Sequence, residues 1–157
     1  MATTAFTAIE RYRALSVDRV NLGSLAPETQ NSDYESAQLE INSQLWHIRT
    51  ARITPNKPGA FLAFWRRALD GTTEPFSGDD ECVGLKVFVS EGDRFGVFSF
   101  TREHLLSLRV VSAPGIPGKR GFRVYPSWCE ALNPQASRTQ RAQAIAFAEL
   151  IAPTSVV

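Results

Sequence analysis

The sequence predicts an α/β fold in a single domain, with a mixed sheet of about five strands and three or four helices. Three observations predict it. The chain has 157 residues, of which 43% are hydrophobic and 21% are charged, a composition typical of globular domains of this size. Several runs alternate apolar and polar residues with the period of a strand. Others carry apolar residues at the spacing of a helix.

The N-terminal part predicts a helix and a linker. Residues 5–15 (AFTAIERYRAL) form one apolar face at helical spacing. The inward residues are Phe6, Ile9 and Tyr12. Residues 22–33 contain Gly, Pro, Asn and Ser, which are typical of a connecting segment. We therefore expect residues 1–27 to be an N-terminal helix and linker, and residues 28–157 to be the α/β domain.

Two hairpins follow from the alternating runs. Residues 38–42 and 45–53 flank a turn at Asn42-Ser43, and residues 83–90 and 95–100 flank a second turn. In the first hairpin, one strand face carries Trp46, Ile48 and Thr50, and the opposite face carries His47, Arg49 and Ala51.

The remaining segments are expected as follows. Residues 61–69 favour a helix, because Phe61, Phe64, Trp65, Ala68 and Leu69 follow helical spacing, although Phe61, Ala63 and Trp65 also fit a strand. The acidic residues 70–82 and the Gly- and Pro-rich residues 112–121 predict loops. Thr101 is expected to cap a short helix, residues 122–125 to form a strand, and residues 134–151 to form the last helix.

Charge is segregated along the chain, although the net charge is only +1. Residues 1–46 and 70–93 sum to −3 and −6, whereas residues 47–69 and 94–157 each sum to +5. A nearly neutral protein can therefore carry a basic face, provided that the two positive segments lie side by side.

Most catalytic and cofactor sites are not indicated. Neither a nucleophile elbow nor a phosphate-binding glycine loop is present, and the two cysteines form neither a zinc pattern nor a disulfide framework. Glu40 and the run Asp79-Asp80-Glu81 are the only candidates for a divalent cation, and such a run in a loop is usually solvated. We predict no catalytic residue, no metal and no cofactor. An apolar span and a signal-peptide pattern are also lacking, so we expect a cytoplasmic protein without a membrane partner.

Phosphate binding is better supported. The loop Gly118-Lys119-Arg120-Gly121 leads directly into Arg123, Tyr125 and Trp128, a combination that can hold a nucleic-acid backbone and stack a base. Equally, Tyr125 and Trp128 can pack in the core while the two loop cations merely solvate a turn. The predicted nucleic-acid-binding residues are Arg49, Arg52, Lys57, Arg66, Arg67, Lys119, Arg120, Arg123, Tyr125 and Trp128.

The order of several motifs resembles the MepB family over about residues 28–147. The matching segments are Asp33-Tyr34, Arg49 to Pro55, Lys57 to Phe61, Trp65-Arg66-Arg67, Pro75-Phe76, Asp79-Asp80, Phe95 to Phe98, Gly118 to Gly121, Arg123 to Trp128, Gln135-Ala136, Thr139-Gln140 and Gln143. The chain departs from the family pattern at Arg52, Ala60, Val97, Ser127 and Ala142, where lysine, two glutamines, proline and tryptophan are usual.

The resemblance implies an intracellular α/β protein with a proposed connection to nucleic acid and a distant likeness to restriction-endonuclease-type sheets. The hypothesis we favour is a nucleic-acid-binding protein without hydrolytic activity. A divalent-metal nuclease that uses Glu40 and residues 79–81, and a protein-interaction or regulatory module, remain as alternatives.

Overall fold

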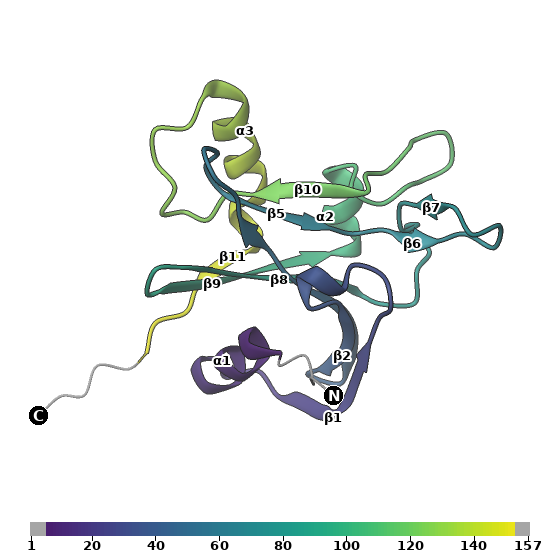
Figure 1. Ribbon diagram of the computed structural model, residues 1–157, viewed down its shortest axis with the longest axis horizontal. Coiled ribbons are helices and arrows are strands. Elements are labelled where there is room, and N and C mark those ends of the chain that lie inside the picture. The colour runs from purple at the N-terminus through teal and green to yellow at the C-terminus, as the bar shows by residue number, and fades with distance from the viewer. Residues whose placement is uncertain (1–5, 153–157) are drawn as a thin grey trace, which may run out of the picture.

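The computed structural model describes residues 6–152 and centres on a six-stranded mixed sheet with the order β1-β2-β3-β8-β9-β11 (Figure 1). Its strands are β1 (Val20–Pro27), β2 (Ala37–Ile41), β3 (Gln44–Thr50), β8 (Gly84–Glu91), β9 (Arg94–Thr101) and β11 (Phe147–Glu149). Only β3 and β8 pair in parallel, and the other neighbours are antiparallel. The predicted α/β class with a mixed sheet is confirmed.

Both predicted hairpins are present, although the strand predicted over residues 45–53 ends at Thr50, and residues 52–53 pair in another sheet. β2 and β3 pair antiparallel around Asn42 and Ser43, which both adopt positive φ as a tight turn requires. β8 and β9 pair along their whole length, with Gly84 opposite Thr101 and Glu91 opposite Arg94. The alternation within β3 also holds, because Ile48 belongs to the core on one face of the sheet and His47 packs against Phe64 and Phe76 of the core on the other.

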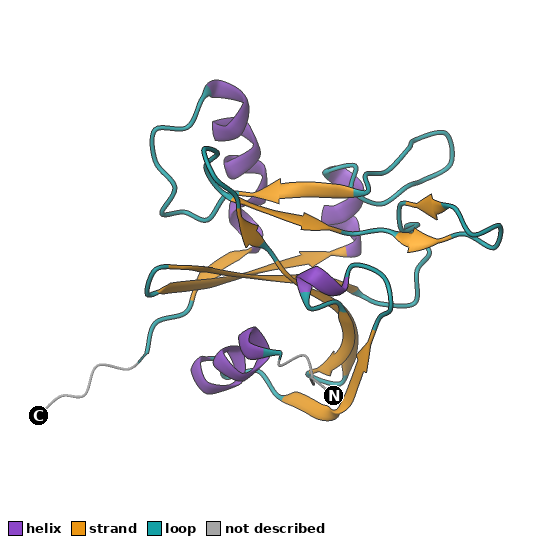
Figure 2. Ribbon diagram, viewed as in Figure 1, coloured by secondary structure: helices purple, strands orange, loops and turns teal. Residues whose placement is uncertain are grey.

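A second sheet packs against the first. It has the order β10-β5-β4, formed by β10 (Gly121–Val124), β5 (Ala60–Ala63) and β4 (Arg52–Ile53) (Figure 2). The buried residues Leu62 and Val124 of this sheet meet Val87 and Phe100 of the large sheet in one core cluster. A separate two-stranded ribbon joins β6 (Arg66–Arg67) to β7 (Thr73–Glu74).

The segment predicted as a helix over residues 61–69 is instead β5 followed by β6. Burial alternates through β5, where Ala60 and Leu62 face the core and Phe61 does not. The strand alternative was therefore the correct one, because pairing on both sides of β5 outweighs the helical spacing of the aromatic residues. Gly59, at φ +76°, lets the preceding turn approach β10, since a Cβ there would lie 2.6 Å from the carbonyl oxygen of Val124.

The expectation of a linker over residues 22–33 is wrong for its first half, because β1 extends to Pro27 and pairs with β2. The pairing is irregular between Asn21 and Ala26, a stretch that includes Gly23, whereas Pro27 at the end of the strand lies opposite Ala37. Helix α1 (Thr7–Leu15), just before it, covers the face of the large sheet that lies away from the second sheet. Ile9 and Tyr12 are buried there, as predicted.

The other helices lie near the second sheet (Figure 1). α2 (Arg102–Ser107) begins at the predicted cap, where the hydroxyl of Thr101 accepts a hydrogen bond from the amide of His104. α3 (Pro134–Gln143) is shorter than the predicted 134–151, and short 3-10 turns occupy Ser32–Tyr34 and Ala144–Ala146. Phe147 then pairs with Phe98 as part of β11, so edge pairing with β9 replaces the last helical turns. No helix in the described range combines the length and apolar character needed to span a membrane.

Replacing Tyr12 with alanine should lower the free energy of unfolding by roughly 3–5 kcal/mol, because it empties a fully buried aromatic site against Phe88. Urea denaturation measures the loss. Val17→Ala, at a side chain that is 98% exposed, is the control and should change stability by less than about 0.5 kcal/mol. Equal effects of the two substitutions would show that α1 is an appendage, not part of the core.

Candidate functional site

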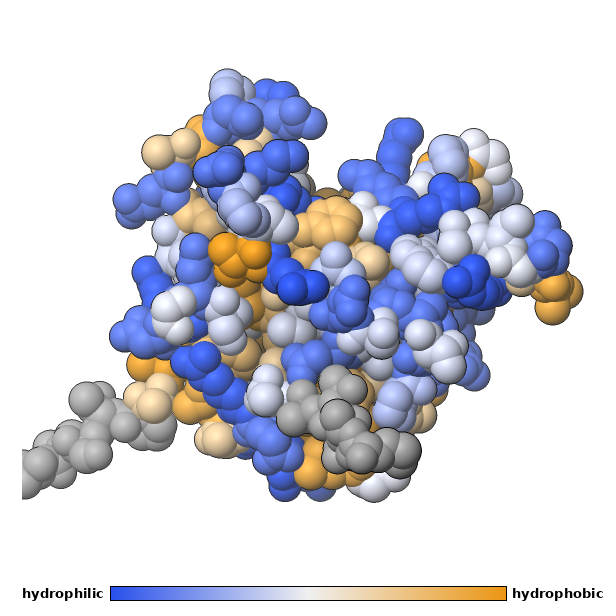
Figure 3. Space-filling model, in the orientation of Figure 1, coloured by the Kyte–Doolittle hydropathy of each residue, from blue (hydrophilic) through white to orange (hydrophobic). Residues whose placement is uncertain are grey.

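A groove of about 700 Å³ lies between β10, α3 and the turn at residues 54–59. Its cationic lining residues are Lys57, Lys119, Arg123 and Arg138, and no Asp or Glu belongs to the described lining. Figure 3 shows that hydrophilic side chains cover α3, one wall of the groove. The groove therefore combines positive charge with open access.

Gln143 attaches α3 to the edge strand of the second sheet. Its side-chain amide donates to the carbonyl oxygen of Arg123 at 2.8 Å and accepts from the amide of Tyr125 at 2.9 Å. Asn133 caps the other end of α3, since its Oδ1 accepts from the amide of Ala136 at 2.8 Å. Both ends of the helical wall are thus held by side-chain hydrogen bonds.

The groove cations differ from other cations of the protein in their pairing. Within residues 6–152, Lys57, Lys119 and Arg138 have neither an ion pair nor a side-chain hydrogen bond. Arg123 donates only to uncharged acceptors, the carbonyl of Pro58 at 3.2 Å and the hydroxyl of Thr54 at 2.6 Å. Their positive charge is consequently not neutralised by the protein's own carboxylates.

Strand register brings the two basic segments together on the outer face of the second sheet. Arg52 lies opposite Phe61 in β4–β5, and Phe61 lies opposite Arg123 in β5–β10. Directly opposed residues share a face, so the three side chains form one row across the sheet. Residues 52–57 and 119–123 therefore lie side by side, although about sixty positions separate them along the chain.

Three other predicted residues lie near the β6–β7 ribbon and make protein contacts. Arg66 pairs with Glu74 at 3.0 Å, and Arg67 donates to the carbonyl of Gly71 at 3.0 Å. Arg120 donates to the hydroxyl and carbonyl oxygens of Thr73. None of the three lines the groove.

The two predicted aromatic residues have different surroundings. Tyr125 is half-buried and lines the groove. Trp128 packs edge-on against Phe147, donates its indole N–H to Glu91 at 2.8 Å and lies under Arg94. Of the two alternatives considered for these residues, Trp128 packs against the protein, whereas Tyr125 is accessible from the groove.

Arg49 does not face a ligand. Its side chain is fully buried between the two sheets, where it donates to Glu28 at 2.9 Å and to Asn31 at 3.1 Å. The prediction that it contacts phosphate is corrected by this burial, because the guanidinium is surrounded by protein and neutralised by a carboxylate. Arg49 has a structural role.

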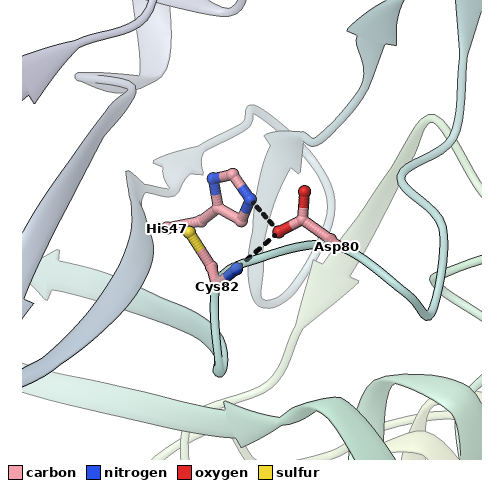
Figure 4. A group of neighbouring side chains, drawn as sticks. All are labelled: His47, Asp80 and Cys82. Atoms are coloured by element: carbon pink, nitrogen blue, oxygen red, sulfur yellow. Dashed lines mark hydrogen bonds and ion pairs between the residues drawn. The ribbon is translucent and has the colours of Figure 1, made fainter.

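Beside this ion pair lies an ionic network centred on His47 (Figure 4). His47 Nδ1 lies 3.2 Å from Glu28 and Nε2 lies 2.7 Å from Asp80. Burial alone would lower the pKa of His47, but its interactions with Asp80, Cys82 and Glu28 outweigh burial and raise the pKa to about 11. The ring is therefore an imidazolium at neutral pH.

The acidic residues considered for metal catalysis do not converge. Asp80 turns inward to His47, which corrects the expectation that the whole run 79–81 is solvated. Glu40 lies on β2, near Asn21, and belongs to no cluster of metal-ligating groups among the described residues. The pair of sites expected for a nuclease, Glu40 with residues 79–81, is not assembled.

Comparison with known proteins identifies the family of this chain. A family model described as MepB-like matches residues 28–149. The chain belongs to the MepB-like family. A crystal structure of MepB is similar with a TM-score of 0.79 and 28% sequence identity, over 95% of this chain and 97% of that one. No curated protein matches the sequence.

The MepB structure covers 95% of this chain, a larger share than residues 28–149, which the family model matches. Sequence reasoning missed Arg138 and Glu28 as important residues. Arg138 carried a usable signal, because helical spacing places it away from the apolar face of α3, but Glu28 stood in a segment that resembled a linker.

We expect Glu28→Gln to lower the free energy of unfolding by roughly 3–5 kcal/mol, because the buried Arg49 loses its carboxylate partner. Combining it with Arg49→Met should recover a large part of this loss, since no unpaired buried cation then remains. A double-mutant cycle measured by urea denaturation quantifies the coupling.

Arg94→Gln is the matched control. It breaks the more exposed pair with Glu149 and should cost no more than about 1 kcal/mol. A loss in Glu28→Gln no larger than in this control would contradict the structural role of the buried pair.

Proposed function

We propose that this MepB-like protein binds a nucleic acid in the groove between β10, α3 and residues 54–59, and that it does so without hydrolysing the bound strand. The observation that carries the proposal is the set of four groove cations that no carboxylate of the protein neutralises. Such cations release counterions when they meet phosphates, and this release provides most of the sequence-independent affinity of nucleic-acid-binding proteins.

The distribution of the cations favours a chain of phosphates over a single small anion. Lys57 comes from the turn, Lys119 from the loop before β10, and Arg138 from α3, so the charges surround the groove instead of converging on one point. Arg52, in the row with Phe61 and Arg123, extends the basic surface across the second sheet. A backbone with regularly spaced phosphates can contact all of these elements together.

Tyr125 supplies an aromatic surface in the same groove. Its backbone amide is held by Gln143, so the position of the residue is fixed while its ring lines the groove. Stacking of a base on an aromatic ring contributes about 1–3 kcal/mol and tolerates any sequence. Tyr125 therefore supports an unpaired base next to the bound phosphates.

The composition of the groove supports a binding role without hydrolysis. Metal-dependent hydrolysis of phosphodiesters requires carboxylates that hold a divalent cation beside the phosphate. The described lining offers amides, two hydroxyls and cations, and the side-chain amides of Asn133 and Gln135 can donate hydrogen bonds to phosphate. These groups suit binding of the phosphate and not attack on it.

Replacing Arg138 with glutamine should weaken binding of oligonucleotides to a similar extent for all sequences, and reduce the slope of log K against log salt by about one. Fluorescence anisotropy with labelled single-stranded DNA, duplex DNA and RNA, titrated from about 50 to 200 mM salt, measures both quantities. Tyr125→Leu should weaken only the single-stranded ligands, and leave the salt slope unchanged.

Arg19→Gln is the matched control, because this exposed arginine precedes β1 and does not line the groove. It should leave affinity and salt slope as in the wild type. No binding of any oligonucleotide at about 50 mM salt would overturn the proposal. Saturable binding of an acidic peptide in place of oligonucleotides would also overturn it, and would indicate a protein partner.

A further inference from the structure

We propose that His47, Asp80 and Cys82 form a binding site for a divalent transition-metal ion of the zinc type, separate from the basic groove. One ligand atom of each residue lies within 4.8 Å of the other two. His47 comes from β3, and the other two come from the loop that precedes β8 (Figure 4). None of the three residues lines the groove, so the site and the groove can be tested independently.

The donor set selects the kind of ion. An imidazole nitrogen, a thiolate and a carboxylate oxygen are the three ligand types that bind Zn²⁺. Mg²⁺ and Ca²⁺ prefer oxygen ligands alone, and a thiolate disfavours them. Ligand atoms around a tetrahedral zinc ion lie roughly 3–4 Å apart, so the three groups need to contract by only about 1 Å. Water supplies the fourth ligand, as in zinc sites with three protein ligands.

The surroundings of His47 match those of a metal-binding histidine. Nε2 points toward Asp80, while Nδ1 faces Glu28 at 3.2 Å. A carboxylate that accepts the Nδ1 proton directs the Nε2 lone pair to the metal, an arrangement that accompanies most histidine ligands. Glu28 is itself held by Arg49 at 2.9 Å. The partners that orient a ligand are thus already in place.

The loop that carries the other two ligands is held in shape before an ion arrives. Arg102 of α2 donates to the carbonyl oxygens of Asp80 at 2.6 Å and of Cys82 at 2.9 Å. The amide of Cys82 donates to Asp80 Oδ2 at 3.1 Å, and the amide of Val83 donates to Leu45 at the start of β3. Little conformational entropy is therefore lost when both side chains bind one ion.

Space and access are compatible with an ion. The three residues help to line a small cavity of about 10 Å³, close to the volume that a single water molecule requires. Cys82 is 2% exposed, whereas the side chain of Asp80 is 18% exposed. An ion reaches the cluster past Asp80 and is shielded from solvent once it is bound.

Charge remains balanced when the ion binds. The charged or ionisable groups around the cluster are Glu28, Arg49, Arg66, Asp80, Glu81, Cys82 and Arg102. The incoming divalent cation replaces two protons, one from His47 Nε2 and one from the Cys82 thiol, and both protons pass to solvent. The net charge of the buried cluster is thus unchanged.

The test uses the full-length protein after treatment with a chelator and dialysis. We expect one equivalent of Zn²⁺ to bind, measured by elemental analysis, and to raise the midpoint of thermal unfolding by several degrees, whereas Mg²⁺ has no effect. Co²⁺ should give a thiolate-to-metal charge-transfer band. The band should disappear in Cys82→Ser and in His47→Gln, and persist in the matched control Cys129→Ser.

The Cys129→Ser protein keeps the test decisive even when Cys82→Ser does not fold, because Cys82 is then the only thiol of the chain. A charge-transfer band at one equivalent of Co²⁺ in this protein assigns the ion to Cys82. Absence of stoichiometric Zn²⁺, absence of the band in Cys129→Ser, or retention of both in Cys82→Ser would overturn the proposal. Oligonucleotide binding with unchanged affinity in His47→Gln would show that the groove does not depend on this site.

Discussion

The buried ion pair between Glu28 and Arg49 is the constraint on which the rest of the structure depends. Arg49 lies at the centre of the large sheet with its side chain fully buried, so its charge must be met inside the protein. Glu28 meets it from the segment that follows β1, and Asn31 adds a further acceptor while also accepting from the backbone of Trp65. One arginine thereby joins the segment after β1 to the central strand and, through Asn31, to the segment after β5.

The same pair organises the interior polar network. Glu28 contacts both Arg49 and His47, and His47 contacts Asp80. Burial alone would raise the pKa of Glu28, but its contacts with His47 and Arg49 outweigh burial and hold the pKa below the usual value. The carboxylate therefore stays ionised between two cations, and Asp80 attaches the loop before β8 to β3 through His47. Stability in this region is electrostatic as well as hydrophobic.

Regular alternation made part of the fold predictable. The hairpins β2–β3 and β8–β9, the cap at Thr101 and the inward face of α1 follow from spacing and turn residues alone. Prediction failed where two periods fit the same residues, as in the segment of Phe61 and Phe64. There, the secondary structure is determined by pairing of β5 with the nearby β4 and with β10, which is distant in the sequence. Phe147 is a second case, because it belongs to a strand only through pairing with the edge strand β9.

The chemical character of the candidate site could be predicted from the sequence, but the set of residues that forms it could not. Arg49 and Arg52 differ by three positions and have the same charge, yet one is buried and the other is exposed on the second sheet. Which face of a strand is covered depends on a sheet formed by residues 60–63 and 121–124, and a local pattern contains no information on it. Lys57, Lys119 and Arg123 were identifiable as basic turns and strands. That Arg138 lies in the same groove depends on the position of α3 against β10.

The side chain of Gln143 has a consequence for association between molecules. An edge strand normally exposes unpaired amide and carbonyl groups that can recruit a strand from another chain and begin aggregation. On β10, the carboxamide of Gln143 already occupies the carbonyl of Arg123 and the amide of Tyr125. The carboxamide makes the two hydrogen bonds that the backbone of one residue in a neighbouring strand would make. Growth of the small sheet by edge-to-edge addition is therefore blocked at this position, which leaves the edge available to ligands that approach through side chains.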